Sequence, residues 1–227
     1  MHAATGWHAD GMDVPRSADD APDVAAAGHV RPHRVPESLT VAEVARRVLA
    51  AAPRATRALV AIDGVGASGK TTFARALARH VTTRPVVLLH ADDFFQPPAV
   101  RYARGRYSPE GFWLDAFDTP AMRAALDRLA VGVGPAPTDA LVLVEGVFLH
   151  RDELVDRWDF SLWLDVPPDE ARRRMVERDG LDPDDPRLAR YAGAQRLYAL
   201  AARPWDRASM VVHMSGQGGV GASDPVT

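Results

Sequence analysis

The amino-acid sequence predicts an α/β fold, a three-layer α/β/α sandwich in which helices cover both faces of a five-stranded parallel sheet. Two observations predict it. Five short apolar runs are continuous rather than alternating, which indicates strands that are buried on both faces. Segments with helical periodicity separate these runs, as expected for a parallel sheet with crossover helices. The five runs are 58–62, 86–89, 141–144, 160–164 and 210–212.

The first predicted helix precedes the first strand. Thr40 and Glu43 have the spacing of a capping box, in which each side chain accepts a hydrogen bond from the other residue's backbone N–H. The apolar stripe of this helix is Val41, Val44, Ala45, Val48 and Leu49. The strand 58–62 follows it, and a second helix then continues to Val81. We therefore expect these two helices and the strand between them to begin the ordered part of the chain.

Three further helices are predicted from their start signals. Thr119-Pro120 begins one of them, because proline fits the first position of a helix. The arginine-rich segment Pro168–Arg178 is the second. Asp185-Pro186 opens a longer third helix that ends near Pro204. Helices and strands thus alternate along the chain, and no internal repeat is visible.

The composition is that of one ordinary globular domain. The chain has 227 residues, of which 47% are hydrophobic and 25% are charged. We predict the domain over 38–214, with disordered tails at 1–37, which lacks apolar periodicity, and at 215–227, which is rich in glycine. Several of the histidines lie in the first tail, so a metal-binding tail is the alternative there to a plain disordered segment.

Cysteine content and net charge exclude several classes of protein. The chain has no cysteine, which excludes a disulfide framework, cysteine–zinc sites, iron–sulfur clusters and thiol catalysis. The net charge of −3 argues against a chain that coats nucleic acid or anionic membrane. No secretory signal or membrane-spanning run is visible. We expect a cytoplasmic protein without nucleic-acid or membrane partners; the sequence leaves a homo-oligomer open.

A glycine-rich loop follows the first strand and matches the pattern G-x-x-x-x-G-K-[ST] in full. Glycines let the backbone curl so that N–H groups point at phosphate oxygens, and the helix that follows adds positive potential. Lys70, the only lysine in the chain, supplies a charge to the β- and γ-phosphates of a nucleotide, and the Thr71 hydroxyl can ligate Mg²⁺. The predicted nucleotide-binding residues are Gly64, Val65, Gly66, Ala67, Ser68, Gly69, Lys70, Thr71 and Thr72.

Three other interpretations of the loop are weaker. An ordinary glycine-rich turn does not require the Lys-Thr pair that follows the last glycine. A dinucleotide-binding fingerprint is disfavoured for the same reason. A GTPase of the class that reads guanine with an Asn-Lys-x-Asp element is excluded, because the chain has no asparagine and Lys70 is already committed. A transferase or an ATPase remains.

Acidic residues follow three of the predicted strands, and ligands gather at the carboxyl ends of strands in this architecture. Asp92, in the pair Asp92-Asp93, suits the residue that orients or deprotonates an acceptor hydroxyl, and the predicted metal residues are Thr71, Glu145 and Asp92. Glu145 suits a Mg²⁺ ligand or its support, together with Thr71. The alternatives are a cap or turn for the aspartate pair and a solvated strand end for Glu145. Asp165 is expected to cap the helix that follows it.

Arginines are concentrated on the predicted helix Pro168–Arg178. Arg174 and Arg178 are four residues apart and therefore share one face. A lid that carries them would stabilise the charge of a triphosphate and exclude water. The alternative is a solvated face of arginine and glutamate. The predicted catalytic set is therefore Lys70, Asp92, Arg174 and Arg178.

The stretch 101–118 is long, aromatic and basic, and we predict it to be a loop. Loops of this length in a compact domain are usually functional, and this one has residues that could hold an acceptor by stacking and by arginine contacts. The alternative is a surface loop whose aromatic side chains pack into the core. The predicted substrate residues are Asp93, Arg101, Tyr102, Arg104, Trp113 and Asp115.

Taken in order, these motifs resemble the uridine kinase/phosphoribulokinase family, and in particular the uridine kinase-like proteins of actinobacteria. The resemblance covers about 58–213 and rests on the loop of 62–72, Asp92-Asp-Phe, Asp115-Ala-Phe-Asp118, Val144-Glu-Gly-Val, the arginine helix and Arg190-Tyr191. It implies an ATP-dependent small-molecule kinase with a mobile lid. It also implies that Asp92 is the base, that Glu145 is the magnesium-associated carboxylate, and that Arg174 and Arg178 are lid arginines.

Two departures concern the acceptor. Uridine kinases have a long hairpin that helps to hold uracil, where this chain has only the Gly/Pro-rich segment 130–139. Phe112 or Trp113 replaces the aspartate that contacts ribose. We therefore expect a Mg-ATP-dependent kinase for a small nucleoside- or sugar-like hydroxyl acceptor. The alternatives are a nucleotide-binding regulatory or scaffold protein with a degenerate acceptor pocket and, less favoured, a nucleic-acid-acting ATPase.

Overall fold

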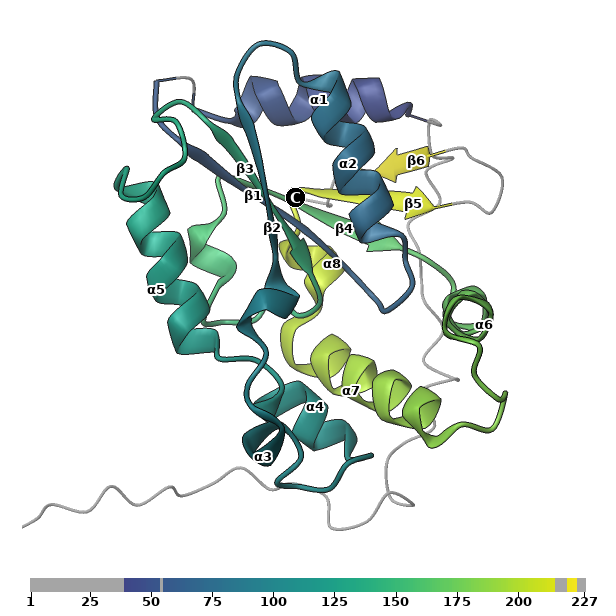
Figure 1. Cartoon of the computed structure of the whole chain (residues 1–227). Helices are drawn as coiled ribbons and strands as arrows, with labels where there is room; N and C mark the ends of the chain where they lie inside the picture. Colours follow the sequence, from purple (N-terminus) through teal and green to yellow (C-terminus); the bar gives the residue numbers. More distant parts are fainter. Residues whose placement is uncertain (1–38, 54, 215–219, 224–227) are drawn as a thin grey trace, which may run out of the picture. The chain divides into compact units, whose positions relative to one another are not determined.

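A computed structural model describes residues 39–53, 55–214 and 220–223 (Figure 1). It contains one six-stranded sheet with the order β2-β3-β1-β4-β5-β6. The first five strands of this order run parallel, and β6 pairs with β5 in the antiparallel direction. The predicted three-layer α/β/α fold with five parallel strands is therefore confirmed, and β6 is added at one edge.

The bounds of the elements follow the predicted alternation. The strands are β1 (Ala58–Gly64), β2 (Val86–His90), β3 (Leu141–Gly146), β4 (Phe160–Asp165), β5 (Met210–Met214) and β6 (Val220–Ser223). The longer helices are α1 (Val41–Ala51), α2 (Lys70–His80), α5 (Thr119–Ala130), α6 (Pro168–Asp179) and α7 (Pro186–Ala202). The short helices are α3 (Pro98–Arg101), α4 (Pro109–Asp115) and α8 (Pro204–Arg207), and the 3-10 turns are η1 (Ala91–Phe94) and η2 (Val155–Arg157).

Two hydrophobic cores lie on opposite faces of the sheet because alternate strand residues point in opposite directions. Val60 and Ile62 of β1 belong to the core under α1 and α2. Leu59 and Ala61 of the same strand belong to the core under α4, α5 and α7. Both faces of β1 are thus covered, which explains why its sequence is apolar without alternation.

Local signals in the sequence fix the starts of several helices. The capping box of α1 is present, with the Thr40 N–H donating to Glu43 at 2.6 Å and the Glu43 N–H donating to the Thr40 hydroxyl at 3.3 Å. Asp118 caps α5 by accepting from the Ala121 N–H at 2.9 Å. Asp185 caps α7 in the same way, through the Arg187 N–H. These side chains bond backbone N–H groups of the first helical turns, which have no partner within the helix.

Three predictions differ from the structure. The stretch 101–118 is not one loop, because Ser108 accepts from the Gly111 N–H at 3.0 Å and Pro109 takes the first position of α4. Asp165 does not cap α6; it lies opposite its register partner His213 on β5 and accepts from that ring at 2.8 Å. The tail that we expected to be disordered from 215 contributes β6.

The remaining predicted tail residues, 1–37, 215–219 and 224–227, lie outside the described residues, as does the metal-binding tail that was the alternative for the first of them. Between α5 and β3 the chain takes a short path through 131–140. Arg57 holds this path by donating to five backbone carbonyls, those of Leu129, Val133, Gly134, Ala136 and Pro137. No strand forms there within the described residues, so the segment has no hairpin.

Candidate active site

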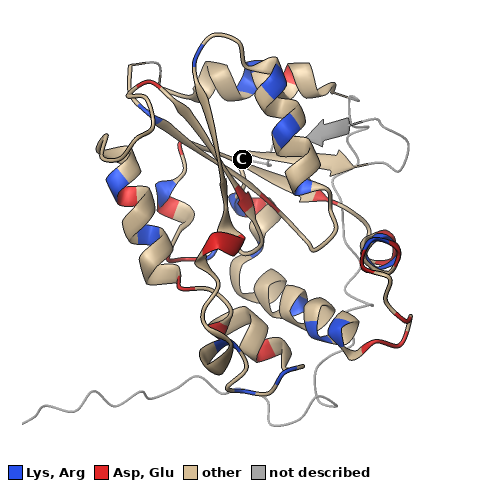
Figure 2. Ribbon diagram, viewed as in Figure 1, with Lys and Arg blue, Asp and Glu red and all other residues tan. Residues whose placement is uncertain are grey.

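The carboxyl ends of the parallel strands bring the predicted site residues to one edge of the sheet. β1 ends at the glycine-rich loop, which leads directly into α2. Glu145 on β3 is the register partner of Ile62 on β1 and of His90 on β2. The turn η1 follows β2 at the same edge, and Figure 2 shows acidic residues on it. The loop, Glu145 and the aspartate pair therefore lie at one edge, as expected because ligand sites form at the carboxyl ends of parallel strands.

The shape of the loop depends on two glycines. Gly69 has a φ of +90° at the start of α2, a conformation that other residues rarely adopt. Gly69 also has no side chain that could accept hydrogen bonds from the first turn of α2. The backbone N–H groups of that turn therefore have no side-chain cap. At Gly64 a Cβ atom would lie 2.8 Å from the Ser68 hydroxyl and 2.9 Å from the Leu164 carbonyl. The loop thus curls tightly and leaves a helix N-terminus suited to an anion.

Lys70 lies at the centre of the loop and is buried. Its Nζ donates to the Gly64 carbonyl at 3.0 Å and to the Val65 carbonyl at 2.8 Å. Burial lowers the pKa of Lys70, whereas the carboxylates of Asp63 and Glu145 act in the opposite direction. The loop therefore positions an ammonium group beside the helix N-terminus, where a phosphate would complete its hydrogen bonds.

Glu145 is buried and connects three elements of the site. Its Oε1 accepts from the Thr71 hydroxyl at 2.8 Å and lies 2.6 Å from Nδ1 of His90. This arrangement disagrees with a solvated strand end. Carboxylate and hydroxyl oxygens are donors that suit Mg²⁺, which commonly takes one or two protein ligands and completes its coordination with water and phosphate oxygens. Thr71 and Glu145 fit that role.

Among the residues that the structure describes, no cluster of three or more His, Cys, Asp or Glu side chains could hold a metal ion on its own. A metal at this edge would therefore depend on ligands that the nucleotide brings.

Asp92 and Asp93 lie on η1, directly after β2, and both residues are exposed. The surrounding protein atoms partly desolvate Asp92, and the Glu145 carboxylate repels its charge, so the pKa of Asp92 is raised. Lys70 acts against this shift. An exposed carboxylate of raised pKa can accept a proton from a hydroxyl group.

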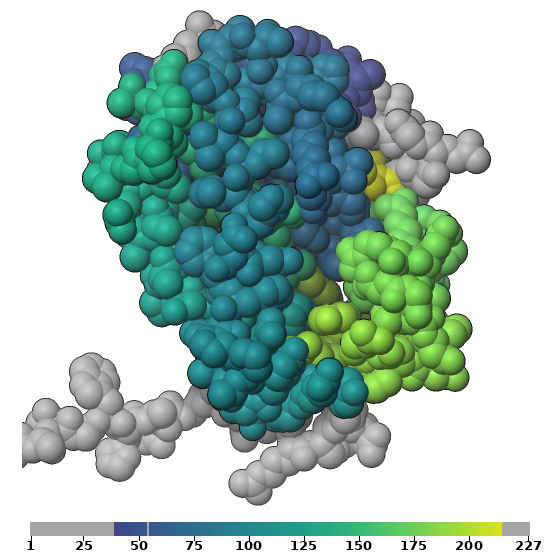
Figure 3. All heavy atoms as spheres, in the orientation of Figure 1, coloured from purple at the N-terminus to yellow at the C-terminus, as the bar shows by residue number. Residues whose placement is uncertain are grey.

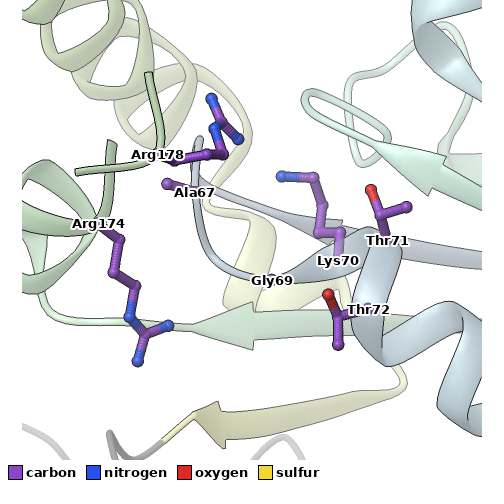
Figure 4. A pocket seen from close by; sticks show the side chains of 7 residues that line it. All are labelled: Ala67, Gly69, Lys70, Thr71, Thr72, Arg174 and Arg178. Carbon is purple, nitrogen blue, oxygen red and sulfur yellow. The ribbon is translucent and has the colours of Figure 1, made fainter. Parts of the chain in front are cut away.

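The arginine helix α6 faces the loop. Arg174 and Arg178 line a pocket of about 270 Å³ together with Lys70 and Thr71 (Figure 4). Arg174 donates to Glu170 at 2.8 Å, and Arg178 donates to Asp179 at 2.7 Å. The hydrogen bonds from Arg173 and Arg174 lower the pKa of Glu170 to about 2. The two arginines thus line the pocket opposite the loop. Their helix also carries ion pairs on its exposed face.

Further loop residues complete the lining of this pocket. These residues are Ala67, Gly69 and Thr72. Figure 3 shows a hollow on this face between the yellow-green spheres of the α6–α7 region and the blue and teal spheres of α2 and α4.

Asp93 lies on η1, and the other predicted substrate residues fall into three sets. Tyr102 and Arg101 lie together on α3 and its end, with the Arg101 guanidinium 5.0 Å from the Tyr102 ring centroid. Arg104 and Asp115 form an ion pair with each other at 2.7 Å. Trp113 packs edge-on against Phe148 in the core, with the ring centroids 5.0 Å apart. This packing accounts for the position of the tryptophan without any contact to an acceptor.

Trp113 lines a separate cavity of about 180 Å³, together with Arg151 and Glu153 among others. Trp113 is not among the residues that line the pocket at the loop.

The sequence analysis missed a buried hydrogen-bond centre under the loop. The fully buried Asp63 accepts from the Gly64, Leu149 and His150 N–H groups at 2.7, 2.9 and 3.1 Å. The His150 ring lies 2.9 Å from the same carboxylate, and the Tyr198 hydroxyl donates to it. Asp63 follows an otherwise apolar run, and this position could have indicated a buried carboxylate. Its partners lie on distant segments, and no sequence pattern connects them with Asp63.

The fold and the loop define the class of the protein as a P-loop nucleotide-binding protein. Comparisons with known proteins refine this class. Nicotinamide riboside kinase 2 of Mus musculus is 30% identical over 148 residues, which are 57% of this chain and 72% of that protein. Uridine kinase of Leuconostoc citreum is 27% identical over 142 residues, 53% of this chain and 68% of that protein.

A solved structure of a possible uridine kinase from Bacillus stearothermophilus supports the fold. It matches with a TM-score of 0.61 and 24% identity, covering 75% of this chain and 96% of that chain. No family model matches the chain. The sequence relatives nevertheless suffice: the chain belongs to the uridine kinase/phosphoribulokinase-like family of P-loop kinases. No helix within the described residues is long and apolar enough to cross a membrane.

Proposed function

We propose that the protein is a Mg-ATP-dependent kinase that transfers the γ-phosphate to a hydroxyl group of a small nucleoside- or sugar-like acceptor. The observation that carries the proposal is the convergence of Lys70, the Thr71–Glu145 pair and Asp92 at one edge of the sheet. Relatives named as kinases of small molecules support it. The absence of cysteine fits a reducing compartment such as the cytoplasm.

In this proposal the chain's residues divide the work of phosphoryl transfer. The loop amides and Lys70 bind the β- and γ-phosphates, and Arg174 and Arg178 neutralise charge from the opposite wall of the pocket. Thr71 and Glu145 would hold Mg²⁺, which would supply positive charge that neutralises the phosphates during transfer.

Asp92 orients the acceptor hydroxyl and takes its proton. The bond between the γ-phosphorus and the bridging oxygen of ADP breaks as the bond to the acceptor oxygen forms. The products are ADP and the phosphorylated acceptor, and the proton of the hydroxyl stays on Asp92 until it passes to solvent. The raised pKa of Asp92 makes its carboxylate a better proton acceptor than an ordinary aspartate.

The decisive variant is Asp92→Asn, which keeps the size of the side chain and removes its charge. We expect ATP affinity within about threefold of wild type and acceptor-dependent turnover lower by about 10²–10⁴-fold, the usual contribution of a positioned base. The control is Asp139→Asn, an exposed carboxylate that precedes β3, whereas Glu145 lies at the other end of that strand. Near-wild-type turnover in Asp92→Asn would refute the assignment of the base.

A second candidate function is a nucleotide-binding regulatory or scaffold protein. The short path through 131–140 favours it, because this chain lacks the hairpin expected to hold a nucleobase. Tight ATP binding without turnover across a broad acceptor panel would support this candidate. Intact contacts of Glu145 with both Thr71 and His90 favour the kinase.

A further inference from the structure

An arginine on α7 is buried without a hydrogen-bonding partner. Arg190 is only 5% exposed, and its Nε and Nη2 atoms are shielded from solvent with no hydrogen-bond acceptor among the described residues. A guanidinium stays ionised in proteins, and buried charges are ordinarily paired. Such an unsatisfied buried group calls for an explanation, and an absent ligand is one of the few available.

Aromatic rings fix the guanidinium of Arg190. Its Cζ lies 4.6 Å from the ring centroid of Phe112, 5.2 Å from that of Tyr102 and 5.6 Å from that of Tyr191. The faces of these rings attract the cation, but they do not accept the hydrogen bonds of its in-plane N–H groups. The rings of Tyr102, Phe112 and Tyr191 therefore orient the guanidinium and leave its N–H donors to another partner.

The positive charge of this region is not balanced locally. The Arg101 guanidinium lies 4.9 Å from the Phe95 centroid and 5.0 Å from that of Tyr102, and its Nε is also shielded and unpartnered. Arg106 lies 5.9 Å from the same tyrosine ring. Within the part of the chain that the structure describes, no carboxylate pairs with any of these three arginines, so an anion would be attracted here.

Three observations connect this cluster with the proposed active site. The Tyr191 ring meets that of Phe112 at 5.0 Å. Tyr191 and Asp92 both interact electrostatically with Arg178, which lines the nucleotide pocket. The segment that carries Tyr102 begins directly after η1, the turn that holds Asp92. A small molecule whose hydroxyl reaches Asp92 would thus extend toward the arginine cluster.

We propose that Arg190, supported by Arg101, binds an oxyanion of the acceptor, so that the acceptor is a hydroxyl compound with a carboxylate or phosphate group and not a neutral nucleoside. The inference rests on the proposed kinase function and adds the charge class of its acceptor. Arginine suits this role because its planar fork forms two parallel N–H bonds to carboxylate or phosphate oxygens. Arg190 sets specificity and takes no part in bond making.

The first experiment measures binding to the wild-type full chain by calorimetry, with acceptors offered as neutral and anionic pairs. The pairs are glycerol with D-glycerate and D-ribose with D-ribose 5-phosphate, and uridine is the neutral nucleoside. We expect at least one anionic compound to bind tenfold or more tightly than its neutral partner, and the two pairs separate a carboxylate from a phosphate source. Equal binding within both pairs, or uridine binding tighter than both anions, overturns the inference.

The second experiment tests the residue. In Arg190→Gln we expect the anionic preference to fall to less than about twofold, and in Arg190→Lys to fall several-fold, because lysine keeps the charge without the fork. Arg196→Gln, an exposed arginine on the same helix, should keep the wild-type preference. A purely structural Arg190 would lower the melting temperature in Arg190→Gln and leave the preference unchanged, which overturns the inference. If Arg190→Gln does not fold, Arg190→Lys decides.

The same assays separate this inference from the proposed function. Lys70-dependent turnover with uridine and no anionic preference supports the kinase and overturns the anionic acceptor. Arg190-dependent binding of an anion without any turnover supports the anion site and overturns the kinase. Failure of every anionic compound to bind at millimolar concentration overturns the inference whatever the turnover.

Discussion

The buried carboxylate of Asp63 allows the sharpest prediction about stability. Its Oδ1 accepts one hydrogen bond, from the Gly64 N–H, and its Oδ2 accepts the others, including those of His150 and Tyr198. Asp63→Asn places an NH2 group where one of these oxygens was, so at least one buried donor loses its acceptor. The remaining bonds also lose the charge that strengthened them.

The magnitude follows from these bonds. Losing one hydrogen bond to a buried charge and weakening the others should lower the free energy of unfolding by about 3–5 kcal/mol. That is a large share of the roughly 5–15 kcal/mol of a typical domain. The melting temperature should fall by about 6–20 °C at about 2–4 °C per kcal/mol.

Urea denaturation measures this loss directly, as a lower midpoint with an unchanged slope. The matched control is Asp159→Asn, because the exposed Asp159 accepts a bond from the Leu59 N–H at 2.8 Å. Its expected cost is about 1 kcal/mol. A loss in Asp63→Asn below about 1 kcal/mol, or equal to that of the control, would refute the reasoning that this carboxylate organises the region under the loop.

Three further predictions concern the site and its supports. Gly146→Ala places a Cβ on top of that of Ala91 at the start of η1, so we expect a stability loss of about 1–3 kcal/mol in urea denaturation and a several-fold lower kcat. Arg57→Ala releases the loop between α5 and β3 and should cost about 2 kcal/mol, measured in the same way. Because the pKa of Asp92 is raised and its charged form accepts the proton, kcat/KM should fall as the pH falls through a value above that of an ordinary aspartate; an acid limb at or below the ordinary value would contradict this.

The strands β1 and β3 were predictable because all of their residues are buried, so burial alone determines an apolar run such as Ala58–Ile62. The helix α4 was not predictable from the sequence, because its start at Ser108-Pro109 lies among arginines and glycines that are typical of loops. The strand β6 has the sequence Val-Gly-Ala-Ser, which has little strand propensity, and forms by pairing with the edge strand β5.

The site divides in the same way. Lys70 and Thr71 were predictable because one local motif carries them. The contact of His90 with Glu145 depends on β2 lying next to β3, and the sequence does not state the order of strands in the sheet. The error at Asp165 has the same origin, since its partner His213 is a neighbour only through the pairing of β4 with β5.

The central claim is tested most directly by ADP release from Mg-ATP, measured with the purified wild-type chain and with Lys70→Ala over a panel of hydroxyl acceptors. The panel contains uridine, cytidine, nicotinamide riboside, pantothenate, D-glycerate and simple sugars with their phosphates. We predict that at least one acceptor stimulates release more than tenfold in wild type and not in Lys70→Ala. Tight ATP binding without stimulation by any acceptor would contradict the kinase and favour a regulatory nucleotide-binding protein.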